Sequence, residues 1–306
     1  MTDNDSSSPA LPQPAAGAPQ GPPPWQQAAF RPLSDTGAGL GESPVWSARH
    51  TCVWWVDISG ARLLRTPLDG PTEITATPET PGFVQVVDGA VFVGMQSGIF
   101  RYDTEHARFD KLVALPATTQ RFNDACCDAQ GRIWAGTMDC DNLRNDGVLY
   151  LFDPAAMTLQ AKAEGYRTIN GLAFDAAAGR LYVSDSHPSV QRVWTHELEG
   201  EALSPPRVFA RFDDLDGRPD GAAMTDDGQY WIAGVGGASL YRFERDGQIS
   251  ARFRVPFNDP TKPAFLPGRA PAMVLTSKGA ADDPEGGRLA LWSDPPCAPQ
   301  QERRHP

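Results

Sequence analysis

Apolar and polar positions alternate along most of the chain in short segments, and small turn-forming residues separate these segments. Three segments share an acidic residue, a turn and then alternating large apolar positions: residues 128–136 (DAQGRIWAG), 175–184 (DAAAGRLYVS) and 226–233 (DDGQYWIA). This pattern is typical of a tight turn followed by a half-buried strand. Weaker copies of it lie at residues 48–57, 87–95 and 270–277.

These copies recur at a nearly constant interval. The large residues at their centres lie 38 to 49 residues apart: Trp54, Phe92, Trp134, Tyr182, Trp231 and Val274. Units of about 40 to 50 residues match one four-stranded blade of a β-propeller. Further short strand patterns fill the intervals, and helical periodicity is nearly absent. We therefore predict an all-β chain folded as a six-bladed β-propeller, with a β-sandwich as the alternative.

An oxygen-bearing polar residue stands 11 or 12 residues before the centre of four copies: Glu42, Asn123, Asn170 and Asp220. Equivalent positions in a propeller are related by rotation about the central axis, so these side chains are expected to converge at one end of the channel. The alternative for each is a turn or cap residue. That alternative is strongest for Asn170, because Asn-Gly is also a common hairpin turn.

The predicted ring offers carboxylate and amide oxygens and contains no His or Cys. Hard oxygen ligands favour Ca²⁺ and suit Mg²⁺ or Mn²⁺ less well, whereas Zn²⁺ sites usually have nitrogen or sulfur ligands. Arg121 lies two residues before Asn123, so alternation puts both side chains on one face of an extended segment. Arg121 is either a substrate-binding residue or an ordinary surface arginine.

Composition sets the domain boundaries that we expect. Of the 306 residues, 41% are hydrophobic, which suits one all-β domain. Residues 1–28 are rich in Pro, Ala, Ser and Gln and lack Lys and Arg, so we predict a disordered tail and no secretory signal. The propeller is predicted over residues 29–294, with a short frayed tail at 295–306.

Charge, apolar runs and cysteine content indicate which partners and which compartment we expect. The net charge of −11 disfavours nucleic acid, and no apolar run approaches the roughly 18 residues of a membrane span. Five cysteines, an odd number without a C-x-x-C pair, indicate a reduced cytoplasmic protein with buried thiols.

Four longer motifs occur in order between Leu40 and Phe265: LGESPVW, RFNDACCDAQGRIWAGTMD, INGLAFDAAAGRLYVSDS and GRPDGAAMTDDGQYWIAGVGG. In these motifs the chain resembles the gluconolactonase, regucalcin and luciferin-regenerating-enzyme family. The resemblance implies a six-bladed propeller that holds one divalent cation at Glu42, Asn170 and Asp220. It also implies that Asp220 is the catalytic base and that Arg121 and Asn123 bind substrate.

The chain departs from the family pattern at two positions. Ile169 stands where a serine is frequent before the N-G-L motif, and Lys262 stands where many relatives have a small residue. Lys262 lies 12 residues before Val274, so it either faces the channel mouth, where it favours a negatively charged substrate, or points to solvent.

From the ring and the resemblance together we expect a metal-dependent hydrolase that opens a sugar lactone, an aldonolactone, to the aldonic acid. The cofactor is one divalent cation, Ca²⁺ before Mn²⁺, Mg²⁺ or Zn²⁺. Two alternatives stay open. One is hydrolysis of organophosphates or other esters at the same metal, and the other is a non-catalytic calcium-binding propeller.

Overall fold

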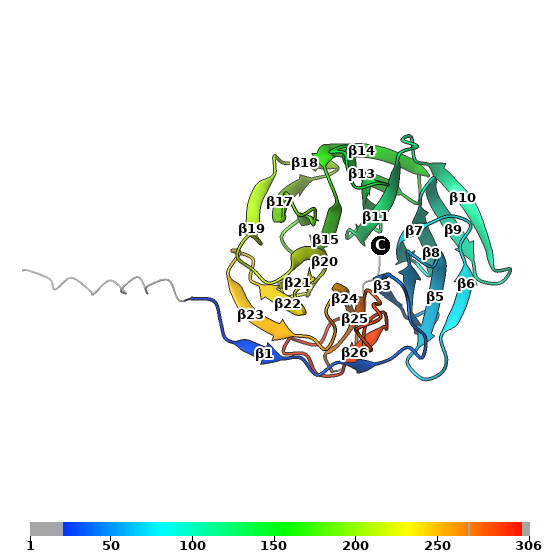
Figure 1. Cartoon of the computed structure of the whole chain (residues 1–306). Coiled ribbons are helices and arrows are strands. Elements are labelled where there is room, and N and C mark those ends of the chain that lie inside the picture. Colours follow the sequence, from blue (N-terminus) through cyan, green and yellow to red (C-terminus); the bar gives the residue numbers. More distant parts are fainter. Residues whose placement is uncertain (1–20, 269, 302–306) are drawn as a thin grey trace, which may run out of the picture.

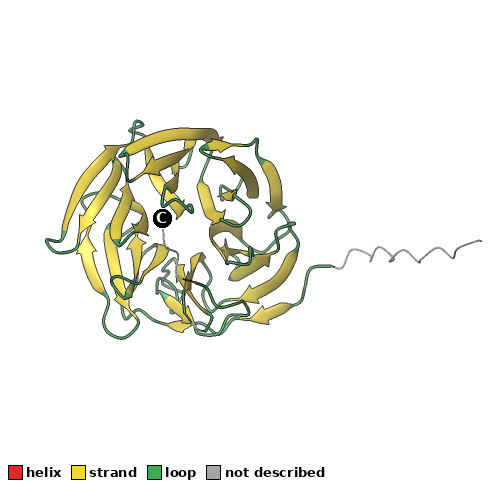
Figure 2. Cartoon of the chain, turned by 180° about the vertical axis from the view of Figure 1, so that it is seen from behind, coloured by secondary structure: helices red, strands yellow, loops and turns green. Residues whose placement is uncertain are grey.

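The chain folds into six β-sheets arranged as a ring around a central axis (Figure 1). The computed structural model describes residues 21–268 and 270–301. Figure 2 shows the same ring from behind, built from strands and loops. No described residue is helical, and no helix there could cross a membrane. The predicted all-β, six-bladed propeller is therefore confirmed.

We number the blades 1 to 6 in chain order of their innermost strands, and each blade follows the chain outward from the axis. The innermost strands, which contact their neighbours around the ring, are β3 (Gly41–Ser47), β7 (Pro81–Val87), β11 (Gln120–Cys127), β15 (Ile169–Asp175), β20 (Arg218–Met224) and β24 (Pro260–Leu266). The second strands are β4 (Cys52–Asp57), β8 (Ala90–Met95), β12 (Ile133–Asp139), β16 (Arg180–Asp185), β21 (Tyr230–Val235) and β25 (Ala272–Ser277). The outer strands are β5 (Arg62–Pro67), β6 (Glu73–Ala76), β9 (Gly98–Asp103), β10 (Arg108–Ala114), β13 (Gly147–Asp153), β14 (Thr158–Tyr166), β17 (Arg192–Glu199), β18 (Ala202–Leu203), β19 (Arg207–Arg211), β22 (Ser239–Phe243), β23 (Ile249–Arg254) and β26 (Ala290–Trp292).

The core lies between neighbouring blades. The six residues predicted to centre the repeats all lie on second strands and are buried. Trp231 of β21, for example, stacks on Phe253, and both pack with Leu275 of the next blade. Burying an aromatic or aliphatic side chain of this size contributes roughly 1.5–3 kcal/mol, so the repeated apolar positions hold the ring together.

Two short N-terminal strands complete the ring. β1 (Trp25–Gln27) pairs in parallel with β23, and β2 (Arg31–Pro32) pairs antiparallel with β26. The Trp25 ring packs against Tyr241 and lies under the Arg254 guanidinium. The predicted tail of residues 1–28 therefore extends too far, because residues 25–28 belong to the propeller. Residues 1–20 lie outside the described residues.

The C-terminal segment is also attached to the propeller. The backbone N–H of Asp226 donates to Oε1 of Gln300 at 2.7 Å, and the Gln301 N–H donates to the Asp226 carboxylate at 2.8 Å. Gln300 is buried. The frayed tail predicted from residue 295 is thus wrong as far as residue 301, and residues 302–306 lie outside the described part of the chain.

Every innermost strand breaks its pairing register near its first residues. The breaks lie between Glu42 and Val45, Pro81 and Phe83, Phe122 and Asp124, Asn170 and Ala173, Pro219 and Ala222, and Pro260 and Pro263. A β-bulge leaves residues unpaired and re-aims their side chains. This repeated bulge places the predicted polar residues at one end of the ring.

Candidate metal and substrate site

The two ligand candidates on neighbouring blades 4 and 5 are in direct contact. Nδ2 of Asn170 donates to Oδ1 of Asp220 at 2.5 Å and to Oγ of Ser186 at 3.0 Å. The next residue, Gly171, has a φ of +57°, and a Cβ there would lie 2.6 Å from both Ser184 Oγ and the Tyr230 hydroxyl. Glycine is needed at this bulge because it tolerates both the left-handed backbone and the close packing.

Glu42 and Asp220 are buried carboxylates, 5% and 7% exposed. Oε2 of Glu42 accepts the backbone N–H of Ser43 at 2.8 Å, and Asp220 accepts from the Asn170 amide. Neither carboxylate has an ion-pair partner within 4.0 Å in the described part of the chain. Two uncompensated buried carboxylates are costly unless a cation joins them.

Burial raises the pKa values of both groups. The pKa of Glu42 lies well above its ordinary value because burial penalises the charge, and the nearby charges of Asp220 and Asp124 add to this effect. Burial raises the pKa of Asp220 to about 8; Asp124 raises it further, while Arg218 and Lys262 oppose the shift. The unmetallated chain therefore holds a carboxyl pair that resists full ionisation.

Asn170 has an amide oxygen that no donor among the described residues uses. This Oδ1 is buried without a hydrogen-bond partner there, although Nδ2 forms both of its hydrogen bonds. Residues 21–268 and 270–301 contain no group of three or more His, Cys, Asp or Glu side chains arranged to hold a metal. A cation held by Glu42 and Asp220 would therefore need the Asn170 amide oxygen as a third protein ligand. This donor set, all oxygen and carrying two carboxylates, fits a hard divalent cation.

Arg121 and Asn123 lie side by side on β11. Nη1 of Arg121 donates to Oδ1 of Asn123 at 2.8 Å and to the Phe122 carbonyl at 2.9 Å. Nδ2 of Asn123 donates to the Ile169 carbonyl on the next blade at 2.9 Å. Burial lowers the pKa of Arg121, and within the described residues no carboxylate pairs with it. The remaining guanidinium donors are free to bind a ligand oxygen.

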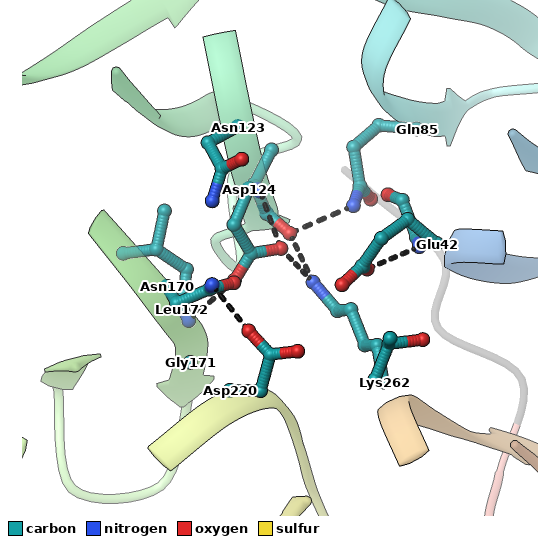
Figure 3. Close-up of polar contacts among 12 residues, drawn as sticks. Glu42, Gln85, Asn123, Asp124, Asn170, Gly171, Leu172, Asp220 and Lys262 are labelled. Carbon is teal, nitrogen blue, oxygen red and sulfur yellow. Dashed lines mark hydrogen bonds and ion pairs between the residues drawn. The ribbon is translucent and has the colours of Figure 1, made fainter. Parts of the chain in front are cut away.

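The two departures from the family pattern have different consequences. Ile169 is fully buried and packs with Trp134 and Leu149, so its side chain belongs to the core between blades. Lys262 is 4% exposed, so of the two alternatives left open for it, the one in which it points to solvent is excluded. Its ammonium donates to Oδ1 of Asp124 and, at 2.8 Å, to the Ala125 carbonyl (Figure 3).

Asp124 is the residue of this cluster that the sequence did not identify. Its Oδ1 accepts the Ala125 N–H and its Oδ2 accepts the Leu172 N–H, each at 2.8 Å. The sequence feature that could have identified Asp124 is its position directly after Asn123 in the RFND motif. Regular alternation assigns neighbours to opposite faces, whereas the bulge in β11 lets both side chains reach the cluster (Figure 3).

A cavity of about 540 Å³ lies along the later halves of the innermost strands. Its lining includes Val45, Ala173 and Ala264, and exposed residues such as Asp88 and Asp226 lie at its rim. The lining does not include Glu42, Asn123, Asn170 or Asp220, whereas Lys262 and Gln85 belong to it. The cavity therefore lies on the other side of Lys262 from the predicted ligands.

Comparison with known proteins gives matches over most of the chain. The model of the family described as "SMP-30/Gluconolactonase/LRE-like region" matches residues 40–279. A 6-deoxy-6-sulfogluconolactonase of Pseudomonas putida is 34% identical over 83% of this chain and 87% of its own. An L-arabinolactonase of Azospirillum brasilense is 32% identical over 83% and 88%.

Solved structures with low sequence identity share the fold. The calcium-binding protein regucalcin of Agrobacterium tumefaciens superposes with a TM-score of 0.82 at 22% identity, covering 91% of this chain and 98% of its own. A gluconolactonase of Xanthomonas campestris gives a TM-score of 0.74 at 23% identity, covering 91% and 96%.

Proposed function

Because the chain belongs to the SMP-30/gluconolactonase/LRE-like family, we propose that it is a metal-dependent lactonase that opens a sugar lactone to its aldonic acid. The observation that carries the proposal is the buried Asn170 oxygen beside two buried carboxylates: within the part of the chain that the structure describes, this oxygen has no hydrogen-bond partner and neither carboxylate has an ion-pair partner. The names of two relatives, both at least 32% identical, support a sugar lactone as the substrate class.

Glu42, Asn170 and Asp220 would hold the cation, with Ca²⁺ as the favoured ion because all three ligands are oxygens. The chemistry supplied by a bound divalent cation is polarisation of the lactone carbonyl and stabilisation of negative charge on its oxygen. Glu42 and Asp220 match the charge of one such cation. Binding by these two groups also removes the cost of their burial without a counter-charge.

Asp220 is the proposed proton acceptor. A water oxygen forms a bond to the lactone carbonyl carbon, and its proton passes to the Asp220 carboxylate. The ring C–O bond then breaks, and the departing ring oxygen takes up a proton to become the hydroxyl of the open-chain acid. In the absence of a cation, burial raises the pKa of Asp220 to about 8; a cation bound to the carboxylate would oppose this shift and keep Asp220 ionised, as a proton acceptor must be.

Arg121 and Asn123 would hold the hydroxyl groups of the sugar. The Arg121 side chain is fixed by its bonds to Asn123 and to the Phe122 carbonyl, so binding a substrate oxygen needs little further ordering. Fixed donors of this kind position the lactone for attack.

The proposal is tested with chelator-stripped protein and a panel of glucono-, arabino-, xylono- and galactonolactones. Proton release is followed with a pH indicator before and after addition of Ca²⁺, Mg²⁺, Mn²⁺ or Zn²⁺. We expect turnover that is lost on chelation, restored by a divalent cation and abolished in Asp220→Asn, a variant of nearly the same shape.

Three other outcomes overturn the proposal. Turnover that survives chelation excludes the metal, and full activity in Asp220→Asn excludes the base. Turnover of paraoxon with no lactone turnover indicates an organophosphate hydrolase at the same residues.

A further inference from the structure

Three buried carboxylates from blades 1, 3 and 5 meet at the ring axis, and within the described chain one of the three forms an ion pair. The charges of Asp220 and Asp124 raise the pKa of Glu42, and the charge of Asp124 raises the pKa of Asp220. Asp124 alone has a cation partner in the described chain, the Lys262 ammonium from blade 6. Glu42 and Asp220 have no ion-pair partner within 4.0 Å among the described residues, although the positive charges of Arg218 and Lys262 act on Asp220 from farther away. One divalent cation would pair with both carboxylates directly.

The Lys262 ammonium lies in surroundings that resemble a cation site. It contacts a carboxylate oxygen of Asp124 and the backbone carbonyl of Ala125, both hard oxygen donors. The Ala125 carbonyl also accepts the Gln85 amide at 2.9 Å, so its direction is fixed. The Asp124 carboxylate is held by two backbone N–H groups. Donors other than the lysine therefore also orient these oxygens.

This position can be reached from the side opposite the predicted ligands. Lys262, Ala125 and Gln85 all line the 540 Å³ cavity, which continues to exposed residues at its rim. The Cβ and the next two carbons of Lys262 pack against Gly221, where an added Cβ would lie 2.4–2.9 Å from them. A shorter side chain at 262 would therefore open space beside Asp124 that solvent and ions can enter.

We propose that the Lys262 ammonium lies where a second divalent cation could otherwise bind. By filling this position, it restricts the channel to one divalent cation at Glu42, Asn170 and Asp220. The inference rests on the proposed metal site. Lys262 acts as a positioning residue: it neutralises Asp124, keeps this carboxylate away from the metal and separates the catalytic side of the channel from the cavity.

The test counts calcium per chain in four proteins: the unaltered chain, Lys262→Ser, Lys262→Met and the double variant Asp124→Asn with Lys262→Ser. Each protein is stripped with chelator and dialysed against Ca²⁺. Bound calcium is then measured by atomic emission, and thermal unfolding is followed with and without Ca²⁺. Serine vacates the position, methionine removes the charge but fills the space, and the double variant removes the carboxylate that needs a cation.

We expect one calcium in the unaltered chain, two in Lys262→Ser, and one in Lys262→Met and in the double variant. Calcium should raise the unfolding temperature of Lys262→Ser more than that of the other three proteins. A single calcium in Lys262→Ser, with the same thermal response as the double variant, overturns the inference. So does a Lys262→Ser chain that stays unfolded in calcium while the double variant folds. No calcium in the unaltered chain instead overturns the proposed metal site itself.

Discussion

Replacing Asn170 by alanine separates a metal ligand from a turn residue. The substitution removes Oδ1, the buried oxygen without a protein partner, together with the two hydrogen bonds of Nδ2. Gly171, which carries the left-handed turn, is unchanged. The two interpretations of Asn170 therefore make different predictions for the metal-free and the calcium-bound protein.

For the metal-free protein, the losses and gains in the free energy of unfolding partly cancel. The bond to the Asp220 carboxylate contributes roughly 1.5–3 kcal/mol and the bond to Ser186 roughly 0.5–1.5 kcal/mol. Removing an unsatisfied buried oxygen recovers about 1–3 kcal/mol. The free energy of unfolding should consequently fall by about 1 kcal/mol at the centre of these ranges and by no more than about 3.5 kcal/mol, which is a shift of a few degrees up to roughly ten degrees in a domain of this size.

In calcium, the difference in unfolding free energy between Asn170→Ala and the unaltered chain should be larger than it is without metal. At a concentration 100 times the Kd, ligand binding stabilises a protein by about 2.7 kcal/mol; if the lost ligand weakens affinity tenfold, the gain falls to about 1.4 kcal/mol. Calorimetry gives the Kd, and thermal unfolding with and without Ca²⁺ gives the stabilisation. Ser186→Ala is the matched control, since it removes one Asn170 hydrogen bond but no ligand. An equal calcium response in Asn170→Ala and the unaltered chain would refute the ligand role.

Three further predictions concern substrate binding, packing and pH. Arg121→Ala should raise KM for the lactone about tenfold or more, a loss of about 1.4 kcal/mol, while kcat changes less; the exposed Arg101→Ala is the control in steady-state kinetics. Gly171→Ala should unfold at lower denaturant than Gly179→Ala, because both have a left-handed φ but a Cβ at Gly179 meets nothing closer than 4.0 Å. The stability of the metal-free protein should fall between pH 6 and 8. The reason is that the Asp220 carboxyl, whose folded pKa of about 8 lies above its unfolded value, binds more protons in the folded state. A denaturant midpoint that stays constant over this range would contradict the prediction, and Asp220→Asn should remove the pH dependence.

The repeat pattern was sufficient to predict the fold and the positions of the ligand candidates. Rotation symmetry turns a constant spacing in sequence into a shared position in space, which is why Asn170 and Asp220, 50 residues apart, could be placed together. The register of their strands follows from buried residues such as Tyr182 and Trp231, whose apolar side chains fix which face is inward.

The Lys262–Asp124 pair could not be predicted in this way. The two residues are 138 positions apart and come from strands on different sides of the ring. Their contact depends on bulges in β11 and β24. These bulges interrupt the regular alternation of side chains from which the sequence assigns each residue to one face of its strand. The proline-rich composition of the N-terminal segment did not indicate that Trp25 packs under Arg254. The two residues are far apart in the sequence, and local composition carries no information on such a contact.

The closure of the ring by N-terminal strands imposes an order on biosynthesis. Gln27 pairs with Arg254, 227 residues later, so β1 is synthesised long before the strand with which it pairs. Until β1 and β2 have paired, the edges of β23 and β26 have unpaired backbone groups, which invite association with other strands. A nascent chain of this protein therefore has to keep its first strands available, without misplaced pairing, until the last two blades have been synthesised.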